Sequence, residues 1–231
     1  MQPEFQTMTP APAQAAAVTR NGVLRNTYML LALSLVPTLF GAWLGVTFQL
    51  GFMRTNPIIS VVVFFAVAFG FFFAIEKFKN SALGVGLLLG FTFFMGLWVS
   101  QLLLVALSFS NGAMVIGMAA GMTSVIFFSL AAMAMTIKKD LSFMGKFLFI
   151  GAVAVIVAML ANMFFQIPAL HLALSALCVV IFSAFILYDL NRIVMGGETN
   201  YVSATLALYL DIYNVFVSLL NILLALTGQK E

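Results

Sequence analysis

The sequence predicts an all-α integral membrane protein with seven transmembrane helices. Of its 231 residues, 64% are hydrophobic and only 7% are charged, a balance that is not typical of a soluble domain of this size. A bilayer core about 30 Å thick takes roughly 20 helical residues to cross. Seven apolar stretches of about that length lie between charges or turn signals, so one membrane domain accounts for most of the chain.

Charges and turn residues delimit the predicted spans in order along the chain. The first span follows Arg25, and the second ends before Glu76. The 58 residues from Asn80 to Ile137 contain no Lys, Arg, Asp or Glu, so we divide them at the turn-like SFSNG, Ser108–Gly112. The predicted spans are Thr27–Phe48, Ile58–Ile75, Ala82–Leu107, Ala113–Ile137, Phe143–Phe165, Ala169–Asp189 and Ser203–Leu226.

The distribution of Lys and Arg among the loops predicts the orientation, because cytoplasmic loops carry the excess. A cytoplasmic N-terminus places eight of the ten basic residues inside, and only Arg54 and Lys230 outside. The eight are Arg20, Arg25, Lys77, Lys79, Lys138, Lys139, Lys146 and Arg192. We therefore expect the C-terminus outside. The net charge of +3 reflects this topology, and no basic cluster indicates nucleic-acid binding.

The first 25 residues are rich in Ala, Pro, Gln and Thr and have no apolar segment ahead of their charges. They predict a flexible cytoplasmic tail, residues 1–25, and not a cleaved signal peptide. The membrane domain is expected to occupy residues 26–228.

Motifs of soluble enzymes are missing from the sequence: there is one histidine, His171, and no HExxH, Walker or GxSxG motif. We therefore expect no enzymatic activity and no cofactor.

Two glycine pairs, Gly86 with Gly90 and Gly117 with Gly121, have the small-xxx-small spacing that lets membrane helices approach closely. Packing within the monomer is the favoured interpretation of these pairs, and dimerisation is the alternative.

The last span carries a stripe of small and polar residues at helical spacing. A charged side chain at the bilayer centre costs on the order of 2.5 to 3.5 kcal/mol, so such residues face a bundle interior or a watery cavity. The last helix is therefore expected to be central. The stripe consists of Asn200, Ala204, Ala207, Asp211, Asn214, Ser218, Asn221 and Ala225.

Two acids, Asp189 and Asp211, lie within apolar spans on either side of a predicted turn at Gly196 and Gly197. At 1.5 Å per residue, their carboxyl groups lie roughly 9 and 16 Å in from that turn, so facing helices could bring them together. Two carboxylates in a low dielectric do not both ionise readily, so we expect them to share a proton that acts as a switch. In the alternative interpretation, Asp211 is a neutral acid bonded to Asn214 or Tyr213 with only a structural role.

Four stretches together resemble one known family: VLRNTYMLLALSL (residues 23–35), KKDLSF (138–143), ILYDLN (186–191) and LYLDIYNVFVSLLNIL (208–223). From about Val23 to Leu226, the chain resembles the Bax inhibitor-1 (transmembrane Bax inhibitor motif) family. The stretches ANMFFQIPALHLALSA and GGETNYVSATLALY are most similar to its proteobacterial inner-membrane branch, which includes the modulator of the membrane AAA protease FtsH. The resemblance implies a seven-helix bundle with the last helix in the middle.

The resemblance also implies a site. Bacterial members with two aspartates are described as pH-sensitive calcium leak channels, and Asp189 and Asp211 occupy the positions of proton sensor and gate. As hard oxygen ligands, the same two aspartates are the candidate ligands for calcium. In the family, an arginine near the end of the second helix can pair with the first aspartate in the closed state. Here that neighbourhood reads FFFAIEKFKN, so Glu76, Lys77 and Lys79 are the possible closed-state partners, although a lysine lacks the planar fork of arginine.

Three functions follow as hypotheses. The first is a pH-sensitive cation leak, with calcium as the transported ion and the lipid bilayer as its surroundings. The second is regulatory binding to an FtsH-type membrane protease, because a flexible end is what a processive protease grips. The third is an intramembrane aspartyl protease, but Leu208, Tyr209 and Leu210 stand where those enzymes carry Gly-x-Gly.

Overall fold

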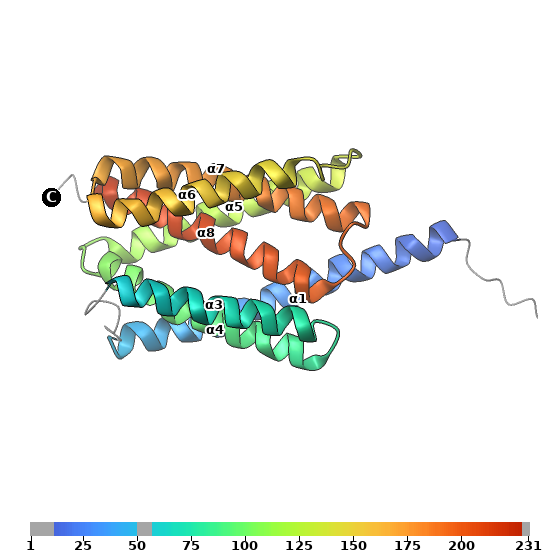
Figure 1. Cartoon of the computed structure of the whole chain (residues 1–231), viewed down its shortest axis with the longest axis horizontal. Coiled ribbons are helices and arrows are strands. Elements are labelled where there is room, and N and C mark those ends of the chain that lie inside the picture. Colours follow the sequence, from blue (N-terminus) through green and yellow to red (C-terminus); the bar gives the residue numbers. More distant parts are fainter. Residues whose placement is uncertain (1–11, 50–56, 228–231) are drawn as a thin grey trace, which may run out of the picture.

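The computed structural model describes residues 12–49 and 57–227 and consists, over those residues, of α-helices and short connections (Figure 1). All seven helices are long and apolar enough to cross a membrane, which confirms the predicted all-α class and the seven spans. The helices are α1 (Pro12–Thr47), α3 (Pro57–Phe78), α4 (Ala82–Leu107), α5 (Gly112–Thr136), α6 (Met144–Phe165), α7 (Pro168–Met195) and α8 (Tyr201–Thr227).

The clearest difference from the predicted boundaries is the start of α1. Helix α1 begins at Pro12 and has 36 residues, so residues 12–25 are helical where the sequence predicted a flexible tail. Proline is favoured at the first helical position, and the alanines that follow have the highest helix propensity. The described part of the chain excludes residues 1–11, 50–56 and 228–231. The two basic residues predicted to lie outside, Arg54 and Lys230, fall in the last two of these segments.

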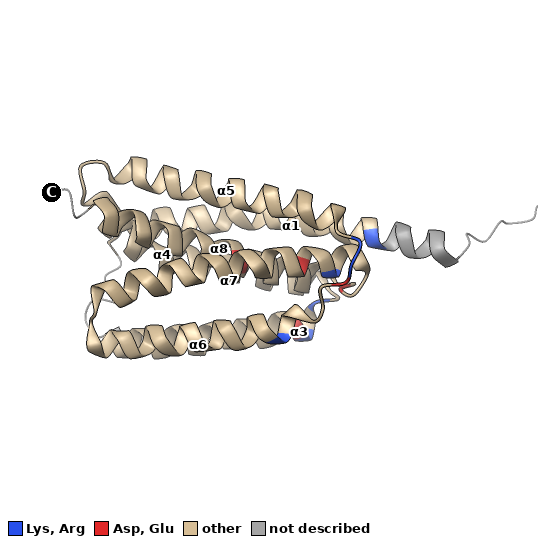
Figure 2. Ribbon diagram, turned by 90° about the horizontal axis from the view of Figure 1, so that it is seen from above, with Lys and Arg blue, Asp and Glu red and all other residues tan. Residues whose placement is uncertain are grey.

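Basic residues gather at one end of the bundle, and α8 ends at the other (Figure 2). We call this end, which carries the α3–α4, α5–α6 and α7–α8 connections, the basic end. It includes Lys77, Lys79, Lys138, Lys139 and Arg192. Such a gathering of Lys and Arg at one end is the asymmetry that the positive-inside rule uses to predict orientation.

Helices α1 and α4 approach closely at three glycines. A Cβ on Gly96 of α4 would overlap the carbonyl oxygen of Thr38 in α1 and lie 2.9 Å from its carbonyl carbon. On α1, a Cβ on Gly41 would lie 3.1 Å from the backbone nitrogen of Leu97, and a Cβ on Gly45 would overlap the side chain of Ser100. Gly41 and Gly45 are four residues apart, so this contact uses the small-xxx-small spacing.

The glycine pairs singled out from the sequence do not make that contact. Gly86, Gly117 and Gly121 are exposed, and no atom lies within 4 Å of the position where their Cβ atoms would stand. Gly90 is in ordinary contact with the Phe71 ring at 3.5 Å. The predicted packing role within the monomer is therefore wrong for Gly86, Gly117 and Gly121, because they lie on the outer faces of α4 and α5.

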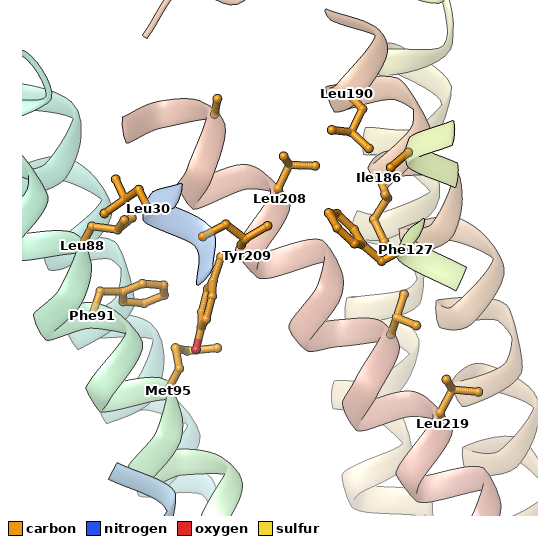
Figure 3. Close-up of a cluster of buried hydrophobic side chains, with 14 of the residues drawn as sticks. Leu30, Leu88, Phe91, Met95, Phe127, Ile186, Leu190, Leu208, Tyr209 and Leu219 are labelled. Atoms are coloured by element: carbon orange, nitrogen blue, oxygen red, sulfur yellow. The ribbon is translucent and has the colours of Figure 1, made fainter. Parts of the chain in front are cut away.

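Helix α8 packs against α1, α3, α4, α5 and α7. In Figure 3, its side chains meet Leu30, Leu88, Phe91 and Met95 on one side and Phe127, Ile186 and Leu190 on the other. The Tyr209 hydroxyl is 2.9 Å from the Thr38 hydroxyl, and the Tyr209 ring packs edge-on against Phe91, with centroids 6.3 Å apart. Apolar packing on both sides thus fixes the rotation of α8 about its axis.

Candidate functional site

The turn between α7 and α8 is fixed by capping interactions at both helix ends. Helix α7 ends at Met195 and is capped by Gly196, whose φ of 81° suits glycine, and the Gly197 amide donates to the Arg192 carbonyl at 2.8 Å. The Asn200 side chain caps α8, since its Oδ1 accepts from the amides of Val202 (2.9 Å) and Ser203 (3.1 Å). The hairpin therefore holds the two helices that carry the predicted acids at a fixed register.

The structure brings Asp189 and Asp211 together across this hairpin. Their carboxyl groups lie close enough to act on each other, and the two residues are only 9% and 5% exposed. Oδ2 of Asp211 is buried and accepts no hydrogen bond from any donor group within residues 12–49 and 57–227. Two carboxyl groups can bond to each other only if one of them is protonated, so a proton shared by Asp189 and Asp211 stays a prediction that this proximity supports.

The lysines expected as closed-state partners do not contact Asp189. Lys79 pairs with Glu76, and the second oxygen of Glu76 accepts from the Ser203 hydroxyl at 3.1 Å. Lys77 lies over the Phe78 ring, 5.6 Å from its centroid. Both lysines thus have other neighbours in this conformation, Lys79 through the i,i+3 pair with Glu76, and pairing with Asp189 in a closed state stays a prediction.

The basic side chain whose charge acts most on Asp189 is Arg192, one turn further along α7. Its guanidinium bonds Glu198 at 3.2 Å, and Glu198 Oε1 accepts from the amides of Thr199 and Asn200 at 2.9 Å. Sequence reasoning used Arg192 only for topology. The i,i+3 spacing of Asp189 and Arg192 was the signal that could have identified it.

The polar stripe of α8 is covered along its described length. Asp211 and Ser218 are buried, and Asn214 and Asn221 are half-buried. Asn214 donates to the Leu210 carbonyl of its own helix at 2.7 Å, and the Tyr213 hydroxyl donates to the Met95 carbonyl at 3.4 Å. In this structure, the polar partner of Asp211 is Asp189, and the alternative of a bond to Asn214 or Tyr213 is not what the geometry shows.

Two charged groups outside the membrane-spanning segments have shifted pKa values. The hydrogen bond to Glu76 raises the pKa of the Lys79 ammonium. Hydrogen bonds from the Ser142 hydroxyl (2.6 Å) and amide (2.8 Å) lower the pKa of the Asp140 carboxyl. Both shifts favour the charged form, so Lys79 and Asp140 at the basic end remain ionised at neutral pH.

Comparison with known proteins places these features in a family. Residues 20–228 match the model of the family described as "Inhibitor of apoptosis-promoting Bax1". An uncharacterised protein of Neisseria meningitidis is 41% identical over 219 residues, which cover 93% of this chain and 96% of that protein. An uncharacterised membrane protein of Vibrio cholerae is 43% identical over 203 residues, 88% of this chain and 89% of that protein.

A further relative has a named activity. The Escherichia coli protein named "Modulator of FtsH protease YccA" is 39% identical over 210 residues, 91% of this chain and 93% of the relative. The same relative is named an inner membrane protein in a second E. coli strain. With its seven apolar helices, the chain is a multi-pass protein of the bacterial inner membrane. The chain belongs to the Bax inhibitor-1 family.

Proposed function

We propose that this protein modulates an ATP-dependent membrane protease of the FtsH type. The observation that carries the proposal is its similarity, along nearly the whole chain, to the E. coli modulator of FtsH. The basic end supports it, since the positive-inside rule directs this end to the cytoplasm, with the N-terminus inside and the C-terminus outside. The three connections of the basic end are then the surface available to a cytosolic protease domain.

The test is a reconstituted degradation assay. The FtsH-type protease of the same host and one of its membrane clients are placed in proteoliposomes, and client loss is followed with increasing amounts of this protein. We expect client degradation to slow as the protein is added. An unrelated seven-helix protein at the same density controls for crowding. An unchanged rate at large molar excess, or equal slowing by the control, contradicts the proposal.

A second candidate function is a pH-sensitive cation leak, with calcium as the transported ion, and the contact between Asp189 and Asp211 favours it. In this proposal, α8 is the central helix, and loss of the shared proton leaves two like charges that repel each other or attract a cation. Calcium prefers carboxylate oxygens but takes six to eight of them, so two aspartates form only a transient site. We propose neither a resident cofactor nor an enzymatic activity.

Calcium flux into dye-loaded proteoliposomes across roughly pH 6 to 8 tests this candidate. We expect Asp211→Asn to abolish the pH dependence of the flux, because the altered pair cannot carry two negative charges. Asp140→Asn is the matched control, since it removes an exposed acid outside the helices and is expected to leave the profile intact. Wild-type and Asp211→Asn proteins with the same pH profile exclude the aspartate pair as the gate.

A further inference from the structure

Asn191 of α7 holds the connection between α5 and α6. Its side chain is fully buried, and both of its polar groups bond to backbone atoms about 50 residues away. The Leu141 amide donates to Asn191 Oδ1 at 2.9 Å, and Asn191 Nδ2 donates to the Lys139 carbonyl at 3.1 Å. One side chain thus replaces the backbone pairing that this connection cannot make within itself.

The start of α6 is docked on the same stretch of α7. A Cβ on Gly145 would lie 2.6 Å from the Tyr188 hydroxyl oxygen, so a larger residue there would have to displace the Tyr188 side chain from the first turn of α6. The Arg192 guanidinium lies over the Tyr188 ring, 5.9 Å from its centroid. Tyr188 is thereby packed between the start of α6 and the ion pair of the α7–α8 turn.

The connection itself is internally ordered. The Asp140 carboxyl accepts hydrogen bonds from both the amide and the hydroxyl of Ser142, and the Met144 amide donates to the Leu141 carbonyl at 2.9 Å. A segment with its own hydrogen bonds moves as a unit when its attachment point moves. The attachment point is Asn191, two residues after Asp189 in the sequence.

Residues 188–192 of α7 therefore connect four parts of the basic end: Tyr188 contacts α6, Asp189 contacts α8, Asn191 contacts the α5–α6 connection, and Arg192 contacts the α7–α8 turn. We propose that Asn191 couples the Asp189–Asp211 contact to the α5–α6 connection, so that breaking the carboxyl contact loosens the surface carrying Lys138, Lys139 and Asp140. Coupling requires an element with two arrangements that both sites bias, and in this proposal the end of α7 is that element. The proposal depends on neither candidate function.

Residue-resolved amide hydrogen exchange of the full chain tests this coupling. In Asp211→Leu, which breaks the carboxyl contact with an apolar side chain of similar size, we expect the Leu141 amide to exchange about fivefold faster or more. In Asp211→Asn, which leaves Asp189 a hydrogen-bonding partner, exchange stays within about twofold of the wild type. If Asp211→Leu does not fold, Asp211→Ala breaks the same contact and is interpreted in the same way.

Two further measurements test the route of the coupling. The Ser142 amide bonds Asp140 within the connection, so it should respond less than the Leu141 amide. Asn191→Ala should itself speed Leu141 exchange by about tenfold and remove any further response to Asp211→Leu. The matched control is the Ile167 amide in the α6–α7 turn at the opposite end, which donates to the Asn162 side chain as the Leu141 amide donates to Asn191. Exchange of the Ile167 amide should not change in Asp211→Leu. An unchanged Leu141 amide in Asp211→Leu, or an equal response with and without Asn191, overturns the proposal.

Discussion

Replacement of Gly96 by alanine is expected to destabilise the fold through the α1–α4 contact. The added Cβ would stand 2.9 Å from the carbonyl carbon of Thr38 and 3.0 Å from the backbone nitrogen of Ala42, whereas non-bonded carbons prefer about 3.5–4.0 Å. Both neighbours are backbone atoms, so no rotamer change relieves the overlap. The two helices must separate by roughly 1 Å, and overpacking of this kind costs about 1–3 kcal/mol.

Gly86→Ala is the matched control, since Gly86 lies in the same helix and nothing lies within 4 Å of its Cβ position. Both substitutions gain the same helix propensity, at most about 1 kcal/mol, so the difference between them isolates the contact with α1. At about 2–4 °C per kcal/mol for a chain of this size, the Tm of Gly96→Ala should lie roughly 2–12 °C below that of Gly86→Ala.

The assay is thermal unfolding of both variants in the same detergent, followed by circular dichroism. Wild-type protein sets the reference, and the difference between the two variants is the quantity compared with the range above. Equal Tm values for Gly96→Ala and Gly86→Ala refute the inference that backbone contact at Gly96 limits the spacing of α1 and α4.

Two smaller effects follow from side-chain contacts at the basic end. Asn200→Ala removes the cap of α8 and should cost about 1 kcal/mol in an unfolding titration; Thr199→Ala, one residue earlier, is the control, and equal losses contradict the cap. Ser142→Ala removes the hydroxyl that lowers the pKa of Asp140, so this pKa should rise towards 3.8. The midpoint of an NMR titration of Asp140 should therefore move to higher pH, and an unmoved midpoint refutes the assignment. A carboxyl pKa that is lower in the folded than in the unfolded chain stabilises the fold at pH values above the unfolded-state pKa, and this stability is lost as the pH falls through the folded-state pKa.

Most of the fold could be predicted from the sequence, because bilayer thickness fixes the length of an apolar span and charges mark where it stops. The predicted span Ala82–Leu107 is the observed α4, and the split at Ser108–Gly112 separates α4 from α5. The start of α1 could not be placed in this way, since hydropathy does not report a helix that continues beyond the membrane. Its 36 residues correspond to about 54 Å, longer than the hydrocarbon core of about 30 Å.

Side-chain contacts could be predicted only where the hairpin fixed them. Asp189 and Asp211 lie near one turn whose glycines are visible in the sequence, so helix rise indicated that facing helices could bring them together. The glycine contacts and the partners of Lys79 depend on how each helix is rotated, and spacing within one helix does not determine that. The spacing of Gly41 and Gly45 is the same as that of Gly117 and Gly121, but only the first pair faces another helix. Asn191 bonds residues about 50 positions away, and no local pattern marked that contact.

The claim that Asp189 and Asp211 hold one proton between their carboxyl groups can be tested directly by infrared spectroscopy. Protein with isotope-labelled aspartate is measured in lipid at neutral pH, and the carboxylic acid band is compared between wild type, Asp189→Asn and Asp211→Asn. We predict a protonated aspartate band in the wild type that is lost or shifted in both variants and unchanged in Asp140→Asn. A wild-type spectrum with only carboxylate bands, in which every aspartate is ionised, contradicts it.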